Sequence, residues 1–401
     1  MSYLGVLCVI ISVMSVRSDT KTIYKSVKSR LQEISALEGI SGLLGWDEMV
    51  MLPNQASAAR GAQKEVLSGI LYEKKSDVLL GQQLKQLHDS HSSELSNVEK
   101  ANVRLAYNDY LRLVLLPKEM VQRQSRLETE GYNAWLEARK FKDFSLFEPC
   151  LSEWVALKRE EAKLIDKTQP MYDTLLYTFE KGMTAKRLDE VFTEVKAGLI
   201  PLINKIRASK PPRTYGHLTG SFDVETQAKL CKEIALDLGF NEMCGRLDVS
   251  VHPFTGGSGP TDVRMTTRFK ENDVTEGLTG AIHETGHSLY EQGRNLGNDY
   301  KDLPVSAALS MGVHESQSLL WERMVALSKP FQEYLLPKLQ SFFPENNNLS
   351  KLTADELYSA MNIVKQPSKI RVEADEVRLA FHYQNVTISD CLLHHILIFS
   401  R

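Results

Sequence analysis

One stretch organises this sequence: Ala281-Ile282-His283-Glu284-Thr285-Gly286-His287-Ser288-Leu289-Tyr290-Glu291-Gln292-Gly293. It contains a His-Glu-x-x-His pair, and in a helix His283 and His287 lie one turn apart on the same face, where both can bind one metal ion. Glu284 then lies beside that ion, in the position of a general base for a bound water. The alternative is two surface histidines on an amphipathic helix, so the assignment needs a third ligand.

Residues on both sides of the pair predict that the segment is helical. Asp273 can cap the N-terminus, with Glu276 three residues later in the arrangement of a capping box. Gly293 supplies a C-terminal stop.

Glu315 is the candidate third ligand, 28 positions beyond His287. That interval fits the rest of the first helix, a loop containing Pro304, and a return helix that ends at about Leu327. Two such helices side by side would bring both histidines and Glu315 to one point with a fourth position for water, as in catalytic zinc sites. His314 is a rival ligand, but adjacent helical residues diverge by about a quarter turn, so we expect it to line the site. The alternative for Glu315 is a solvated helix face.

Composition describes an ordinary soluble globular chain of 401 residues, with 25% charged and 42% hydrophobic residues. The net charge of −3 gives no electrostatic reason to expect nucleic acid as a partner. The five cysteines include no Cys-x-x-Cys pair, which indicates neither a disulfide framework nor a cysteine metal site.

An apolar run near the N-terminus, residues 3–16, has the length of a signal peptide and is too short to span a bilayer. No basic residue precedes it and no clear cleavage site follows it, so a cleaved signal and a plain extension both stay open. The expected location is therefore the cytoplasm, or the secretory pathway if residues 1–18 are a signal. We expect a helical part at residues 19–245, a zinc-binding catalytic part of the same domain at 246–383, and a divergent tail at 384–401.

The fold class predicted from periodicity is mainly α. Apolar residues recur at three- and four-residue spacing in six segments before the metal-binding stretch. These segments are residues 23–44, 95–116, 121–141, 151–166, 184–206 and 224–238.

A short β-ribbon is expected just before the metal-binding helix. Residues 247–251 and 262–269 alternate with period two, and a glycine-rich turn at 255–260 separates them, which predicts a hairpin. Alternation places two sets of side chains on opposite faces: Asp262, Arg264, Thr266 and Arg268 on one, and Val263, Met265, Thr267 and Phe269 on the other. The edge of such a ribbon could hold an extended peptide against its polar face. Alternatively, Arg264 simply pairs with Asp262 or a helix carboxylate.

Taken together, five motifs resemble the signature of the carboxypeptidase Taq family of metallopeptidases. They are His252-Pro253-Phe254, Asp262-x-Arg264-x-Thr266, His283-Glu284-Thr285-Gly286-His287, His314-Glu315-Ser316-Gln317 and Ile370-Arg371-Val372-Glu373-Ala374-Asp375. The resemblance runs from roughly residue 24 to 382. It implies a large, mostly helical domain with a deep groove, a small sheet beside the zinc, and usually a homodimer.

The resemblance also implies an activity, namely removal of single residues from the C-termini of peptides. By motif, His283, His287 and Glu315 would hold one zinc ion, for which cobalt can substitute, and Glu284 would be the base. Arg264 or Arg371 would bind the terminal carboxylate of the substrate, since arginine can bind a carboxylate bidentately. For the oxyanion, the candidate helper in this chain is His252.

One departure from the family pattern leaves an alternative open. Family members continue with a Gly-x-x-Gln-Asp-x-His-Trp motif, whereas this sequence leaves the pattern near Tyr383. The second hypothesis is therefore a non-catalytic truncated relative that binds zinc or peptide, or only dimerises. Intact zinc ligands together with Glu284 favour the enzyme.

Overall fold

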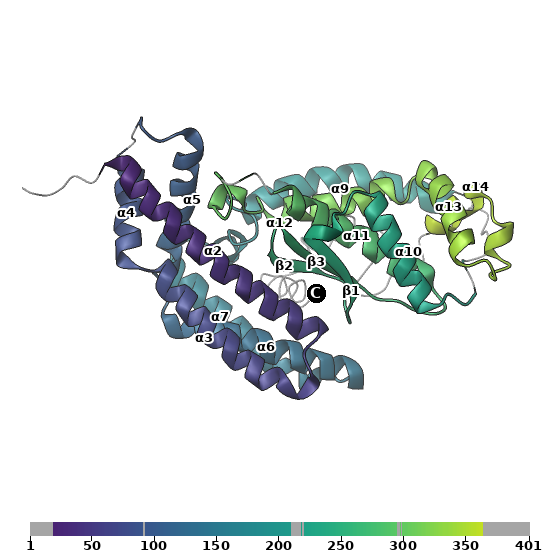
Figure 1. Cartoon of the computed structure of the whole chain (residues 1–401), viewed down its shortest axis with the longest axis horizontal. Coiled ribbons are helices and arrows are strands. Elements are labelled where there is room, and N and C mark those ends of the chain that lie inside the picture. Colours follow the sequence, from purple (N-terminus) through teal and green to yellow (C-terminus); the bar gives the residue numbers. More distant parts are fainter. Residues whose placement is uncertain are drawn as a thin grey trace, which may run out of the picture.

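The computed structural model describes residues 19–90, 93–209, 218, 220–294, 297 and 299–363. The described chain is mostly helical with one small sheet, as predicted. The helices are α2 (Thr20–Val50), α3 (Ser57–Lys75), α4 (Val78–Asp89), α5 (Asn97–Leu113), α6 (Lys118–Phe141), α7 (Glu148–Ile165), α8 (Met171–Leu176), α9 (Ala185–Ala208), α10 (Val224–Asp237), α11 (Val274–Gly293), α12 (Met311–Leu319), α13 (Lys329–Phe342) and α14 (Ala354–Met361). All six helices expected before the metal-binding stretch are present. Figure 1 shows α2 to α7 on one side of the sheet and α10 to α14 on the other.

The N-terminal helices pack through the apolar stripes that their sequences predict. Val27 of α2, Leu84 of α4 and Val103 of α5 are buried in a shared core. Ser96 begins α5 with a full capping box, because its hydroxyl accepts from the Glu99 N–H while the Glu99 carboxylate accepts from the Ser96 N–H. These helices form one wall of the molecule.

The second core is built around α11. Leu278 and Ile282 of α11 pack with Leu230 of α10 and with Leu335 and Leu339 of α13, and all five side chains are almost fully buried. Burial of large aliphatic side chains stabilises by roughly 1.5–3 kcal/mol each. The helix that carries the candidate metal ligands is therefore fixed from behind.

The sheet differs from the predicted hairpin. Its strands are β1 (Gly245–Val249), β2 (Thr255–Gly259) and β3 (Asp262–Thr267), in the order β1-β3-β2. β1 runs parallel to β3, with Arg246 opposite Arg264, and β2 runs antiparallel to β3. The glycine-rich segment expected to be a turn is thus itself a strand, and the tight turn falls at residues 260–261. The predicted alternation of β3 holds over residues 262–265, where Val263 and Met265 are buried, whereas Thr266, expected on the polar face, is fully buried as well.

Glycine lets β2 fit where a side chain would not. Gly257 has a φ of 125°, and a Cβ there would lie 2.0 Å from the backbone oxygen of Asp262. On the facing helix α2, a Cβ on Gly42 would lie 2.3 Å from the backbone oxygen of Gly257. Glycines on both elements therefore allow α2 to pack directly on β2, which explains why this glycine-rich sequence is a strand rather than a turn.

A groove of about 2030 Å³ lies between the N-terminal helices and the elements around α11. Its walls come from α2, α5, β2, α11 and residues 301–309, and they include His314, Gln317 and Trp321. The groove predicted by the family resemblance is therefore present. Within the described residues, no helix is both long and apolar enough to cross a bilayer.

Candidate metal centre

Helix α11 forms where the sequence predicts it. The side chain of Asp273 accepts hydrogen bonds from the backbone N–H groups of Thr275 and Glu276, which caps the helix, and the last helical residue is Gly293. Along the middle of the helix even polar residues are buried, with His283 only 7% and Glu284 only 4% exposed. Buried polar groups require partners, so the surroundings of these two residues define the site.

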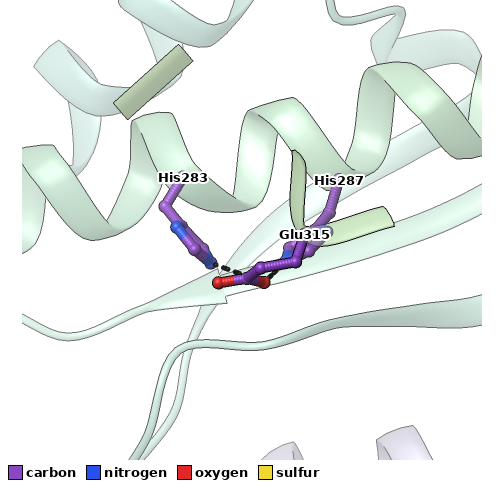
Figure 2. A group of neighbouring side chains, drawn as sticks. All are labelled: His283, His287 and Glu315. Carbon is purple, nitrogen blue, oxygen red and sulfur yellow. Dashed lines mark ion pairs between the residues drawn. The ribbon is translucent and has the colours of Figure 1, made fainter. Parts of the chain in front are cut away.

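His283, His287 and Glu315 converge on one point (Figure 2), with one ligand atom from each lying within 4.8 Å of the others. Oε2 of Glu315 lies 3.8 Å from Nε2 of His283 and 3.4 Å from Nε2 of His287. Metal–ligand bonds of about 2.0–2.2 Å in a tetrahedron place ligand atoms roughly 3.3–3.6 Å apart. The spacing and the imidazole and carboxylate donors therefore fit a divalent metal ion.

Close packing of α12 on α11 brings Glu315 to the histidines. Ser310 caps α12 by accepting from the Val313 N–H. At the crossing point a Cβ on Gly286 would lie 2.7 Å from both the backbone oxygen of Gln317 and the Cα of Ser318. Gly286, inside the His-Glu-x-x-His motif, thus sets the distance between the two helices.

Glu322 orients His283 from outside the cluster. Its Oε2 lies 2.6 Å from Nδ1 of His283, so that Nδ1–H donates to the carboxylate and the Nε2 lone pair faces His287 and Glu315. Glu322 lies in a π-helical turn (Leu320–Val325) that directly continues α12. Such turns occur frequently at functional sites. The sequence patterns did not single out Glu322, although its place about two turns beyond Glu315 on the predicted return helix was a usable signal.

A second chain of contacts orients His287. Its Nδ1 lies 2.7 Å from Nδ1 of His314, and Nε2 of His314 lies 2.8 Å from Oε1 of Glu291. If Nε2 of His287 binds a metal, its Nδ1–H donates to His314, and the Nε2–H of His314 donates to Glu291. Glu291 also pairs with Arg294. His314 therefore lines the site, as predicted, and contacts a ligand histidine from behind.

The electrostatics of the cluster favour ionised carboxylates. Burial opposes charge on Glu315, but the hydrogen bond with His287 and the nearby histidines outweigh it and lower the pKa of Glu315 to about 2. Burial likewise acts to lower the pKa of His283, whereas its hydrogen bond to Glu322 and the charges of Glu284 and Glu315 raise that pKa overall. The site concentrates negative charge around two imidazoles, which suits a cation.

Glu284 lies beside the cluster and is held by the sheet. The hydroxyl of Thr255, the first residue of β2, donates to Oε2 of Glu284 at 2.7 Å and approaches its backbone oxygen at 3.2 Å. The carboxylate thus has a fixed orientation next to the three converging side chains. The same contact holds the start of β2 against α11.

Of the remaining predicted site residues, Arg264 and His252 make the contacts that follow. Arg264 makes a two-pronged ion pair with Asp262, at 2.8 and 3.1 Å, and its guanidinium stacks 4.7 Å from the ring centre of Trp46. Arg264 therefore pairs with Asp262, which is the alternative stated for it in the sequence analysis. Nδ1 of His252 lies 2.8 Å from the backbone oxygen of Pro253. Arg371 lies outside the described residues.

A helical fold with a deep groove, a His-Glu-x-x-His helix and a glutamate from the next helix defines the class of metal-dependent peptidases. The chain belongs to the carboxypeptidase Taq (M32) metallopeptidase family, whose model matches residues 26–384. It is therefore an enzyme of the metallocarboxypeptidase class, and the resemblance inferred from the five motifs is confirmed.

Individual relatives agree with this assignment. The chain is 33% identical over 370 residues to thermostable carboxypeptidase 1 of Thermus thermophilus, covering 90% of this chain and 71% of the relative. It is 33% identical over 355 residues to carboxypeptidase 1 of Bacillus subtilis, covering 88% and 69%. The crystal structure of the M32 carboxypeptidase from Deinococcus radiodurans R1 superposes with a TM-score of 0.78 at 34% identity, covering 90% and 71%. Trypanosoma cruzi metallocarboxypeptidase 1 gives 0.78 at 31% identity, covering 92% and 73%.

Proposed function

We propose that the protein is a zinc carboxypeptidase in which His283, His287 and Glu315 hold the metal and Glu284 is the general base. The observation that carries the proposal is the convergence of these three side chains from α11 and α12, with both imidazoles oriented through their other nitrogens. Two histidines and one carboxylate are the ligand set of catalytic zinc in several peptidases. Cobalt suits the same donors.

Zinc in such a site supplies Lewis-acid polarisation of a carbonyl and acidifies a coordinated water. The chain supplies the proton transfers. Thr255 holds Glu284 through Oε2, so the carboxylate is oriented before the substrate arrives and can accept the proton of the attacking water. Glu284 then delivers that proton to the amine that leaves. Its burial at 4% exposure keeps bulk water from competing for the proton.

Binding of the substrate's terminal carboxylate is assigned to Arg371 in preference to Arg264. Arg264 already directs its fork at Asp262, and Asp262 in turn accepts from Ser258, so a substrate carboxylate would have to displace an existing pair. Arg264 instead stiffens the sheet that holds Thr255. His252, beside the sheet, is the proposed donor to the oxyanion.

The groove accounts for a peptide substrate. β2 pairs with β3 on one side, and Thr255, Gly257 and Gly259 also line the groove. A peptide in the groove that reaches Thr255 also reaches Glu284 on α11, because the Thr255 hydroxyl donates to that carboxylate. Thr255 thus marks the part of the groove where we propose that the last peptide bond would lie, beside Glu284 and the residues that would hold the metal.

The test compares a peptide that ends in a free acid with the same peptide as a C-terminal amide. A charge-assisted hydrogen bond contributes about 1.5–3 kcal/mol, so the amide should lose roughly ten- to a hundredfold in kcat/KM. Arg371→Met should bring the acid-to-amide ratio towards one, while Arg264→Met should leave the ratio high. Equal cleavage of both peptides with internal products would make the protein an endopeptidase. Absence of cleavage with zinc bound would favour the non-catalytic alternative.

A further inference from the structure

Asn102 of α5 is a polar side chain buried in the core of the N-terminal helices. It is 1% exposed and belongs to the part of α5 that also buries Val103. Burial of an amide costs free energy unless its hydrogen bonds are made. Its Nδ2 donates to the hydroxyl of Tyr24 on α2 at 3.2 Å, and its Oδ1 accepts from the backbone N–H of Val305 at 3.0 Å, 203 positions further along. Asn102 therefore holds the turn at residues 303–306 against α2 and α5, the N-terminal wall of the groove.

The same turn is held from its other side by Arg294, which directly follows the last residue of α11. Nη1 of Arg294 donates to the backbone oxygen of Ser306, a residue that is only 7% exposed. Within the turn, the Ser306 hydroxyl donates to the backbone oxygen of Leu303 at 2.8 Å. The turn is thus closed on itself and joins Asn102 on one side to Arg294 on the other.

Arg294 also reaches the candidate metal centre. Its Nη2 donates to Oε2 of Glu291, whose Oε1 lies 2.8 Å from Nε2 of His314. Nδ1 of His314 lies 2.7 Å from Nδ1 of His287. An ionised carboxylate accepts from Nε2–H of His314, which leaves Nδ1 of His314 to accept from Nδ1–H of His287 and leaves Nε2 of His287 free to bind a metal beside Glu315. A chain of hydrogen bonds therefore leads from Arg294 to a metal ligand.

The guanidinium of Arg294 suits this position because it is a planar fork. Its two terminal nitrogens donate to acceptors in different segments, the Glu291 carboxylate on α11 and the backbone oxygen of Ser306 in the turn. Lysine carries one nitrogen on a flexible stem and cannot reproduce the fork. The geometry of arginine, and not its charge alone, therefore makes the connection.

We propose that Arg294 is a positioning residue of the metal centre, which joins His287 to the turn at residues 303–306 and, through Asn102, to the N-terminal wall. This turn lines the groove, so the wall that would contact a peptide and a ligand that would hold the metal are fixed relative to each other. The inference rests on the metal site of the proposed function and not on peptide hydrolysis. A purely structural role for Arg294 would lower the free energy of unfolding and leave the metal affinity of the folded protein unchanged.

The direct test is the zinc affinity of full-length Arg294→Met, measured by competition with a chromophoric chelator. The affinity should fall by roughly two- to thirtyfold, the range for residues that act on a site through other residues. Arg294→Lys should lie between this variant and the parent, because lysine can keep the pair with Glu291 but loses the contact with Ser306. The lysine variant carries the test if the methionine variant does not fold, and urea denaturation of the metal-free proteins shows which variants are folded.

Arg268→Met is the matched control. Arg268 likewise joins a carboxylate of α11, that of Glu276, to a backbone oxygen, that of Val251, but at the other end of the helix. Its replacement should leave the zinc affinity at the parent's value. Parent affinity in Arg294→Met, or an equal loss in Arg268→Met, would overturn the proposal.

A double-mutant cycle tests the part of the chain that reaches Asn102. Asn102→Leu removes both hydrogen bonds of the amide and should also weaken zinc binding. Combined with Arg294→Met it should cause little further loss, because both residues act through the same contacts. Gln227→Met removes another buried amide, on α10, and should destabilise the protein without changing its zinc affinity. Losses that simply multiply in the double variant would show that Asn102 and Arg294 act independently and would contradict the connection.

None of these measurements uses turnover. A parent that binds zinc but hydrolyses no peptide would contradict the catalytic part of the proposed function and leave the role of Arg294 intact. A folded parent that binds no zinc would overturn both.

Discussion

Helices α11 and α9 are of similar length and are both amphipathic in sequence, but they differ in how far they are buried. α11 buries eleven of its twenty residues, including His283, Glu284 and Thr285, whereas α9 buries none of its described side chains. α11 is enclosed by α10, α12, α13 and β3. Periodicity alone therefore indicates that a helix has an apolar face, and only the tertiary structure shows whether that face is covered.

The difference in burial also explains where chemistry can occur. A charged group in α11 is removed from water and must be held by another part of the chain, as Glu284 is by Thr255 and His283 by Glu322. Charged groups on α9 stay at the surface, where an ion pair such as that of Arg187 with Glu190 contributes little to stability. We therefore expect equivalent substitutions to have large effects on α11 and small ones on α9.

The largest contrast is expected for removal of one carboxylate. Glu284→Gln preserves shape but cannot accept the proton of the attacking water, so kcat should fall by roughly a hundred- to ten-thousandfold while zinc is retained. Glu194→Gln on the exposed face of α9 is the matched control and should keep the parent's kcat. Steady-state hydrolysis of a free-acid peptide, with zinc content measured on the same samples, gives both numbers. A Glu284→Gln variant with near-parent turnover would show that this residue is structural.

Sequence patterns predicted the helix that carries His283 and His287 and its cap from local spacing, and the approach of Glu315 from a return helix 28 residues further along. The Asp273 cap, the stop at Gly293 and the approach of Glu315 all agree with expectation. The β-hairpin was wrong in its pairing, since glycines at 255–260 were assigned to a turn. Their role instead is to accept the close approach of α2, a contact between segments more than two hundred residues apart.

Glu322 was missed for a similar reason. Its contact with His283 joins residues 39 positions apart, and although its place two turns beyond Glu315 was a signal, the π-helical turn in which it lies was not predicted. The exposure of Leu202 and Ile206 on α9 could not be predicted either, because an apolar stripe in the sequence does not show what packs on it. Residues at a fixed spacing along the chain can thus be recognised in the sequence, whereas contacts between distant segments cannot.

A smaller effect is expected from substitution of Glu322, which contacts His283 of α11 from the turn that follows α12. Glu322→Gln weakens the hydrogen bond that orients His283, and loss of such an outer contact typically lowers metal affinity by 10–100-fold, about 1.4–2.8 kcal/mol. Competition for zinc with a chromophoric chelator measures the change, and kcat at saturating zinc should stay close to the parent's. Glu333→Gln, an exposed position on α13, is the control. Unaltered zinc affinity in Glu322→Gln would show that Glu322 does not support metal binding through His283.

The smallest expected effects are on the free energy of unfolding. Substitutions of two helical glycines should change it in opposite directions. At Gly286 an added methyl group would meet the backbone of α12 at 2.7 Å, so Gly286→Ala should lower the free energy of unfolding by about 1–3 kcal/mol. At Gly198 of α9 nothing described lies within 4 Å, so Gly198→Ala should raise it by about 1 kcal/mol through helix propensity. Urea denaturation of the two variants checks both signs. Equal effects would mean that α9 is packed as tightly as α11.

The central claim is that the three side chains on α11 and α12 form the metal centre of a carboxypeptidase. Its most direct test is removal of metal with a chelator and titration of zinc back, with metal content and hydrolysis of a free-acid peptide followed together in the parent and in His287→Ala. The parent should regain full turnover at one equivalent of zinc per chain, and His287→Ala should retain little zinc and regain no turnover. Equal zinc in both proteins, or turnover that survives chelation in the parent, would contradict the account.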